Sequence, residues 1–217
     1  MLRWPVVLFD LDGTLADTID LIVASYRHAL RAVLCADLPE PQLRSWIGRP
    51  LRATVAETFP DRVDDVEEVV RVYREWNLAH HDEMIREFPG VRRLLADLEG
   101  SGARLGVVTA KIAQTADLGL RATGLHRRIP VLAGAEATDR HKPDPDPLLH
   151  AASTLQVDPS DCVYVGDSVH DLRAARAAGM SAVGVTWGAG LRHELEAEQP
   201  VAVVDDTIEL STLLRAG

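Results

Sequence analysis

The 217-residue sequence predicts an α/β fold in which a parallel sheet lies between two layers of helices, with a helical segment inserted near the start. Three observations lead to this prediction. The apolar run at residues 6–9 has the length of a buried strand. From about Val91 onward, strand-like and helix-like segments alternate, as is typical of a parallel sheet. Between Asp17 and about Glu87 the pattern is helical and has few strand signals, so this part is expected to lie beside the sheet.

The alternating part of the chain provides most of the sheet and the helices that cover it. The expected strands cover residues 104–109, 130–133, 162–165 and 182–185, followed by a closing apolar segment at 201–204. The expected helices cover residues 91–99, 113–122, 146–155 and 170–178, followed by a closing segment at 208–214. Together with residues 6–9, these segments predict helices on both faces of one sheet.

The inserted part carries two apolar stripes with a helical period. The first stripe consists of Ile19, Ile22, Val23, Tyr26, Ala29, Leu30 and Val33. After a break at Phe59-Pro60, the second consists of Val63, Val66, Val69, Val70, Tyr73, Trp76 and Leu78. We therefore expect residues 17–87 to form a small helical domain, and residues 1–16 and 88–217 to form the α/β domain.

Two acidic residues follow the first strand. Asp10 and Asp12 come directly after the apolar run, and Gly13 then permits a sharp turn. Once the chain turns, both carboxylates can project into one crevice at the carboxyl end of a parallel strand, where ligands bind in open α/β sheets. The arrangement predicts a metal-assisted acid/base or nucleophilic site. Acids that merely cap the next helix are the alternative interpretation.

Three later segments place polar residues at comparable positions. An apolar strand ends in the hydroxyl of Thr109, and Lys142 opens the run Lys-Pro-Asp-Pro-Asp-Pro before a helix. A further strand ends in Asp167, and Asp171 follows four residues later. Together with the Asp10 segment, and in this order, they resemble the four signature motifs of the haloacid dehalogenase superfamily. The resemblance covers nearly the whole chain.

This resemblance implies a Rossmann-like core, the fold of that superfamily, with a helical cap inserted after the first motif. It also implies a phosphatase that acts through an aspartyl-phosphate. Asp10 would be the nucleophile, and Asp12 would protonate the leaving oxygen and then help to activate water. Thr109 would donate a hydrogen bond to a phosphoryl oxygen, and Lys142 would balance the charge between Asp10 and the phosphate.

The cofactor that the resemblance implies is Mg²⁺, which prefers hard oxygen ligands. Its expected protein ligands are Asp10, the backbone carbonyl of Asp12, and Asp167. For Asp171, direct contact with the metal and a role in holding a water or orienting the site stay open as alternatives.

Backbone amides are the expected donors to the substrate phosphate, namely those of Leu11, Asp12 and Ala110. The family often has asparagine after the hydroxyl residue of the second motif, so Ala110 removes a side-chain donor. The run at residues 46–51 resembles a cap loop of phosphoglycolate phosphatases. Arg49 in this run could meet an anionic leaving group, and a plain surface arginine is the alternative.

The expected substrate is a small phosphorylated metabolite, in the first place a phosphoglycolate-like monoester. An inorganic pyrophosphatase of the PpaX type is the alternative, which the run Val-Thr-Ala-Lys at residues 108–111 favours. A phosphomutase, or a protein that binds a phosphate ligand without turnover, would use the same residues.

Composition excludes several classes of partner. A formal net charge of −10 argues against binding to nucleic acid or an anionic membrane, and no apolar stretch reaches membrane-spanning length. Cys35 and Cys162 are expected to be buried, reduced thiols, and His80-His81 a solvated helix end. We therefore expect a cytoplasmic protein that is a monomer or a homodimer.

Overall fold

A six-stranded parallel sheet forms the centre of the structure, a computed structural model that describes residues 2–215. In spatial order its strands are β5 (Val131–Ala133), β4 (Arg104–Val108), β1 (Val6–Phe9), β6 (Cys162–Gly166), β7 (Ser181–Val185) and β8 (Ala202–Val204). β1 pairs in parallel with β4 on one side and with β6 on the other. The chain thus extends the sheet first to one side of β1 and then to the other. Such a switch point creates a crevice at the carboxyl ends of the strands.

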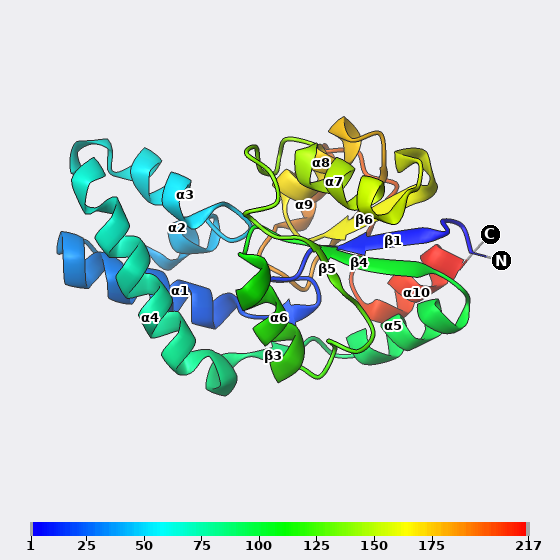
Figure 1. Cartoon of the computed structure of the whole chain (residues 1–217), viewed down its shortest axis with the longest axis horizontal. Helices are drawn as coiled ribbons and strands as arrows, with labels where there is room; N and C mark the ends of the chain where they lie inside the picture. Colours follow the sequence, from blue (N-terminus) through cyan, green and yellow to red (C-terminus); the bar gives the residue numbers. More distant parts are fainter. Residues whose placement is uncertain (1, 216–217) are drawn as a thin grey trace.

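Six helices cover the two faces of this sheet (Figure 1). On one face lie α5 (Val91–Gly100), α6 (Ala113–Ala122) and α10 (Thr207–Arg215), and on the other lie α7 (Asp146–Leu155), α8 (Val169–Ala177) and α9 (Arg192–Ala197). Alternation along β1 explains the two layers, because successive side chains of a strand point to opposite faces. Val7 and Phe9 join the core under the first group, whereas Val6 and Leu8 join the core under the second.

The other helices form a block beside the sheet, at the left of Figure 1. In chain order they are α1 (Ile19–Ala29), the π-helical turn Leu30–Leu34, α2 (Glu40–Arg44), α3 (Leu51–Thr58), the 3₁₀ turn Pro60–Asp65 and α4 (Val66–Met84). The long helices α1 and α4 pack along each other through aromatic side chains. The ring of Tyr26 meets those of Tyr73 and Trp46 edge-on, at centroid distances of 4.8 and 5.0 Å. The elements of this block are helical, as the pattern between Asp17 and Glu87 predicts, and its buried side chains join the same core as Val7 and Phe9.

A short antiparallel ribbon joins the helical block to the sheet. It consists of β2 (Ala16–Asp17) and β3 (Arg86–Glu87), in which Ala16 pairs with Glu87. The chain therefore leaves and re-enters the α/β part at neighbouring points. Two-residue strands are too short to show a period of two, so no residue pattern predicts this ribbon.

The predicted fold class is confirmed, and two helices, α6 and α7, have the predicted bounds. The predicted second apolar stripe is wrong at both ends. Val63 is 59% exposed because it lies in the 3₁₀ turn before α4, and Leu78 is 61% exposed because it follows the buried Asn77 by one residue and points away from the stripe. Within residues 2–215, no helix has both the length and the apolar character needed to cross a membrane.

Two smaller expectations are also wrong. Cys35 is exposed, since it ends the π-helical turn in a left-handed conformation with φ of 52°, whereas Cys162 is buried as expected. His81 is 3% exposed rather than solvated. Its ring packs next to Gly119 of α6, because α4 continues past it to Met84 and holds it against the α/β part.

Candidate active site

Three buried carboxylates gather where β1 and β6 end. Asp10 follows β1, Asp167 follows β6, and Asp171 lies in the first turn of α8. One oxygen from each can be chosen so that all three lie within 4.8 Å of one another. The strands bring them together because β1 and β6 are parallel neighbours, and the amide of Asp10 extends their pairing by donating to Val165 O at 2.9 Å.

Lys142 reaches these carboxylates from the loop before α7. Its Nζ donates to Asp10 Oδ1 at 2.9 Å, to Asp171 Oδ1 at 2.6 Å and to the hydroxyl of Tyr164 at 3.0 Å. The Tyr164 hydroxyl in turn donates to Val108 O at 2.7 Å. An ammonium has three N–H donors, so all the donors of Lys142 are engaged by the protein.

Asp171 is held on both sides of its carboxylate. Oδ1 accepts from Lys142, while Oδ2 accepts from the amide and hydroxyl of Ser168 at 3.1 and 2.7 Å. Ser168 also accepts from the amide of Asp171, which completes a reciprocal cap at the start of α8. This cap fixes the position of Asp171 relative to Lys142.

Asp167 lies in a tight enclosure of glycine backbone. Its Oδ2 accepts from the amide of Ala189 at 2.7 Å, and its Oδ1 has only a long contact of 3.4 Å from the hydroxyl of Thr14. A Cβ atom at Gly13 or at Gly188 would collide with this carboxylate. Gly13 also has a φ of 81°, which side chains disfavour. The turn predicted after Asp12, which has glycine at position 13, therefore leaves room for the carboxylate of Asp167.

These groups leave oxygen atoms that fit a hard divalent cation. Asp10 Oδ2 is buried and has no hydrogen-bond partner. No group within residues 2–215 donates to the carbonyl of Asp12, and Asp167 Oδ1 has only its one long contact. A buried unpaired carboxylate oxygen is costly, and a bound cation would remove that cost. Both oxygens of Asp171 already accept hydrogen bonds, from Lys142 and from Ser168, which supports an orienting role, whereas Oδ1 has a single donor and lies close enough to the other two carboxylates for direct metal contact.

Burial sets the charge state of this cluster. It raises the pKa of Asp10 to about 7, with Lys142 lowering that value and Asp171 and Asp12 raising it. Burial also raises the pKa of Asp167 well above its usual range. Burial alone would lower the pKa of Lys142, but Asp10 and Asp171 raise it well above its usual value. Lys142 therefore stays charged, while Asp10 and Asp167 favour protons until another cation enters.

These pKa directions predict that a divalent cation at this site, such as Mg²⁺, would bind more weakly in acid. Between the unfolded value of 3.8 and about 7, the folded protein holds a proton on Asp10 that the ion must displace. We expect the affinity to fall about tenfold for each pH unit below 7. For the same reason, without metal, the contribution of Asp10 to stability is present at pH 4 and is lost as the pH rises through 7.

Calorimetric titration of Mg²⁺ at pH 6, 7 and 8, in two buffers with different ionisation enthalpies, measures the affinity and the proton release together. The Asp10→Asn variant is the control: its side chain cannot ionise, so only the dependence that comes from Asp167 should remain. An affinity for the wild-type protein that is the same from pH 6 to pH 8 would contradict this charge assignment.

Asp12 lies on the other side of Asp10 and belongs to a different set of contacts. Its Oδ1 accepts from the Thr18 hydroxyl at 2.5 Å and forms an ion pair with the ammonium of Lys111. Thr109, only 3% exposed, accepts at its hydroxyl oxygen from the amide of Lys111 at 3.2 Å. Within residues 2–215, the amide of Asp12 donates to no acceptor, and the same holds for the amides of Leu11 and Ala110. These amides are available to a ligand.

A cavity of about 450 Å³ lies between the helical block and the ends of the strands. Asp10, Asp12, Thr109 and Ala110 line it from the α/β part, and Arg49 lines it from the helical block, where it forms an ion pair with Glu57. The predicted residues that do not line it are Leu11, Lys142, Asp167 and Asp171, each at most 4% exposed. The structure thus separates the predicted set into residues that face the cavity and residues buried behind them.

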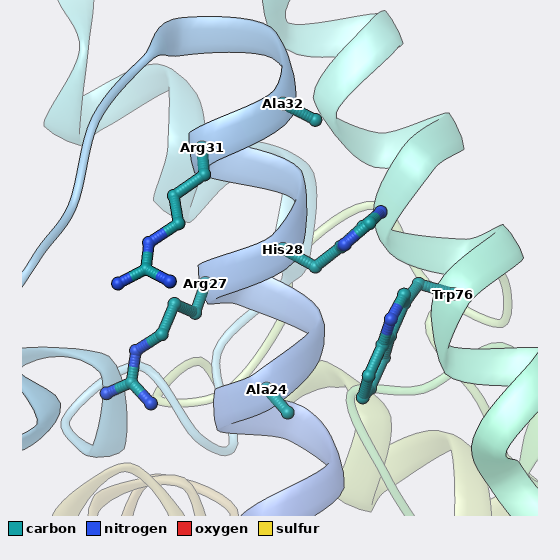
Figure 2. Close-up of a pocket in the computed structure, with 6 residues that line it drawn as sticks. All are labelled: Ala24, Arg27, His28, Arg31, Ala32 and Trp76. Atoms are coloured by element: carbon teal, nitrogen blue, oxygen red, sulfur yellow. The ribbon is translucent and has the colours of Figure 1, made fainter.

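A second hollow lies on the helical block and shares no residue with this cavity. Figure 2 shows Trp76 of α4 beside His28 of α1, with Arg27 and Arg31 on the side of α1 that faces away from Trp76. Both arginines form ion pairs with Asp37. The hollow holds no carboxylate or hydroxyl that could act as a nucleophile, so it adds nothing to the chemistry.

Besides Thr14 and Ala189, which contact Asp167, and Glu57, which pairs with Arg49, four further contact residues are missing from the sequence-based prediction. They are Thr18 and Lys111, which contact Asp12, Tyr164, which contacts Lys142, and Ser168, which caps α8. Ser168 could have been found, because serine three residues before an acidic residue is typical of a helix start. The other three contacts depend on tertiary packing and have no local signal.

Comparison with known proteins assigns the chain to a family. Residues 7–185 match the family model described as haloacid dehalogenase-like hydrolase. The chain belongs to this family. The predicted resemblance is therefore confirmed, and the chain is a haloacid dehalogenase-like hydrolase.

Relatives of this hydrolase point to one group within the family. Pyrophosphatase PpaX of Anoxybacillus flavithermus is 35% identical over 208 residues, which cover 96% of this chain and 95% of that protein. Pyrophosphatase PpaX of Bacillus pumilus is 38% identical over 181 residues, covering 83% and 82%. A solved structure of a predicted phosphoglycolate phosphatase from Haemophilus somnus is 25% identical, with a TM-score of 0.84 and coverage of 98% and 99%. This haloacid dehalogenase-like hydrolase thus lies in the group of PpaX pyrophosphatases and phosphoglycolate phosphatases.

Proposed function

We propose that this hydrolase is a Mg²⁺-dependent phosphohydrolase that acts on a small phosphate compound through an aspartyl-phosphate. The observation that carries the proposal is the state of Asp10, which lines the cavity while Lys142 holds one of its oxygens and the other oxygen has no partner. A carboxylate in that state can bind a cation and attack a phosphoryl group.

The proposed roles of the residues agree with their contacts. An oxygen of Asp10 forms a bond to phosphorus while the bond from phosphorus to the leaving oxygen breaks, and Asp12 gives its proton to that oxygen. A water then attacks phosphorus, Asp12 takes a proton from it, and the bond from phosphorus to Asp10 breaks, which regenerates the carboxylate. Mg²⁺, when bound by Asp10, Asp167 and the Asp12 carbonyl, would neutralise charge on the phosphoryl oxygens.

Other groups bind and orient the substrate. The hydroxyl of Thr109 and the amides of Leu11, Asp12 and Ala110 would donate to the phosphoryl oxygens. Lys142 would keep Asp10 oriented and balance its charge, and Asp171 would orient Lys142. Since Ala110 contributes only its amide, phosphate positioning relies on backbone donors and Thr109.

The proposed first substrate is inorganic pyrophosphate, and the second is 2-phosphoglycolate. Both have an anionic leaving group, and four cationic side chains line the cavity against two carboxylates, Asp10 and Asp12. The cations are Arg49, Arg52, Arg74 and Lys111. The names of the relatives favour pyrophosphate, and a phosphoglycolate-like monoester has the same charge pattern.

We also propose that residues 17–87 act as a cap that closes over the substrate. The cavity is lined from both parts of the chain, and the β2–β3 ribbon provides a narrow connection between them. Closure would exclude water and strengthen the electrostatic contacts inside the cavity. The cytoplasmic location and the monomeric or dimeric state stay predictions from the sequence.

Phosphate release from a substrate panel tests the proposal. The panel holds pyrophosphate, 2-phosphoglycolate, sugar phosphates and nucleotides, each with Mg²⁺ and with chelator. We expect one of the first two to exceed the other compounds by at least about tenfold in kcat/KM and to require the metal. Isomerisation of a sugar phosphate without phosphate release would indicate a mutase. Binding without turnover of any compound would indicate a non-catalytic protein.

A further inference from the structure

Both lysines of the chain lie beside carboxylates of the candidate active site. Lysine and arginine together number 23, and only Lys111 and Lys142 are lysines. Both contact carboxylates of the active site, Lys142 at Asp10 and Asp171 and Lys111 at Asp12. A compact ammonium and a planar guanidinium are not interchangeable at such contacts. Lys142 has a role in the proposed reaction, whereas Lys111 has none so far.

The two ammonium groups differ in how many donors they have left. Lys142 uses all three N–H groups on Asp10, Asp171 and Tyr164. Lys111 Nζ donates to Asp12 Oδ1, and no other acceptor within residues 2–215 contacts it. Two donors of Lys111 are therefore free, and its side chain, 16% exposed, lines the cavity.

The backbone holds Lys111 in place beside Thr109. The amide of Lys111 donates to the Thr109 hydroxyl oxygen at 3.2 Å, and its carbonyl accepts from the amide of Ala135 at 2.8 Å. Lys111 thus reaches Asp12 from a loop with fixed ends, so its ammonium has a defined position in the cavity.

The contact with Asp12 shows which part of the substrate Lys111 would meet. Both Lys111 and Thr18 donate to Asp12 Oδ1, and no group within residues 2–215 donates to Oδ2. Oδ2 is then the oxygen that can serve the leaving group. Whatever is bonded to the leaving oxygen must lie within reach of the Lys111 ammonium when that oxygen approaches Asp12.

We propose that Lys111 is a substrate-binding residue that selects leaving groups with a negative charge close to the departing oxygen, either a phosphate or a carboxylate. This inference rests on the proposed function. Of the other cations that line the cavity, Arg49 and Arg52 form ion pairs with Glu57 and Glu67, and Arg74 of α4 forms none within residues 2–215; none of the three contacts Asp12. Lys111 is the cation with free donors beside Asp12, and a free N–H of Nζ donates to the charged oxygen of the leaving group.

Steady-state kinetics on two kinds of substrate test the proposal. Pyrophosphate and 2-phosphoglycolate have charged leaving groups, a phosphate and a carboxylate respectively, whereas methyl phosphate has an uncharged one. The variants are Lys111→Gln and Lys111→Arg. The matched control is Arg121→Gln, which removes one positive charge from an exposed ion pair with Asp117 on α6.

The selectivity between substrates is the decisive quantity. We expect Lys111→Gln to lower kcat/KM for the two charged substrates about 10- to 100-fold more than for methyl phosphate, mainly through KM, because it removes a charge-assisted hydrogen bond. Lys111→Arg should recover most of the lost kcat/KM on the two charged substrates. Arg121→Gln should change kcat/KM on each of the three substrates by no more than about twofold. A loss that is equal on all three substrates would show that Lys111 only positions Asp12. No loss on any substrate would also overturn the proposal.

Binding separates this inference from the proposed function. Pyrophosphate is titrated with Mg²⁺ into the Asp10→Asn protein, with and without Lys111→Gln, so that no turnover is needed. Weaker binding by about tenfold or more with the second substitution supports the role of Lys111 even if the wild-type protein hydrolyses none of the three compounds. Equal binding overturns it, even if the wild-type protein is an active phosphatase.

Discussion

Asp10→Asn is expected to lower the rate of phosphate release by at least about 10³-fold while the fold is kept. The amide cannot act as the attacking oxygen, and it is a poorer ligand for a cation. The fold should survive because Asp10 is buried at 1% exposure, where an uncharged side chain of the same shape avoids the cost of burying a charge. Phosphate release on the preferred substrate, with circular dichroism and thermal unfolding on the same samples, measures both effects.

Asp61→Asn is the matched control for this experiment, since Asp61 is exposed in the 3₁₀ turn before α4 and far along the chain from the motifs. It should keep the wild-type rate. Residual activity of Asp10→Asn within about tenfold of the wild type would contradict the proposed nucleophile and favour direct attack by water.

Lys142→Met is expected to be the most destabilising single substitution in the active site. Methionine keeps a long flexible side chain but leaves Asp10 and Asp171 without their shared cation. Removing one partner of a buried ion pair costs about 3–5 kcal/mol. The cost should be largest at pH 8 and smaller at pH 5.5, because Asp10, whose pKa is raised by burial to about 7, takes up a proton in acid and then needs no cation.

Urea unfolding of the metal-free wild-type and Lys142→Met proteins at the two pH values measures this difference. Arg140→Gln is the control, because Arg140 is exposed and its ion pair with Asp146 should contribute less than about 0.5 kcal/mol. Equal destabilisation at pH 5.5 and pH 8 would show that the loss of stability does not come from ionised carboxylates left without the positive charge of Lys142.

The sequence predicts the α/β fold because strand-like and helix-like segments alternate along most of the chain. Asp10, Thr109, Lys142 and Asp167 follow from motif order, and the structure places all four around the carboxyl ends of β1, β4 and β6. Their roles in the reaction stay proposals. Local sequence thus identifies residues that lie at strand ends.

The contacts that distinguish one site residue from another do not follow from the sequence. That Lys142 has no donor left and Lys111 has two depends on which acceptors tertiary packing brings near each ammonium. The burial of His81 likewise depends on the position of α6, a segment distant along the chain. A periodic pattern describes the face of one helix and contains no information about the partner of that face.

The pairing of Ala16 with Glu87 also bears on how this protein can change over evolutionary time. Because the helical block begins and ends at two adjacent residues, it can be lengthened, shortened or exchanged without moving any strand of the central sheet. Mutations that reshape the block can alter the substrate range while Asp10, Lys142 and Asp167 keep their positions. The wall that the helical block gives to the cavity can therefore diversify separately from the residues at the strand ends.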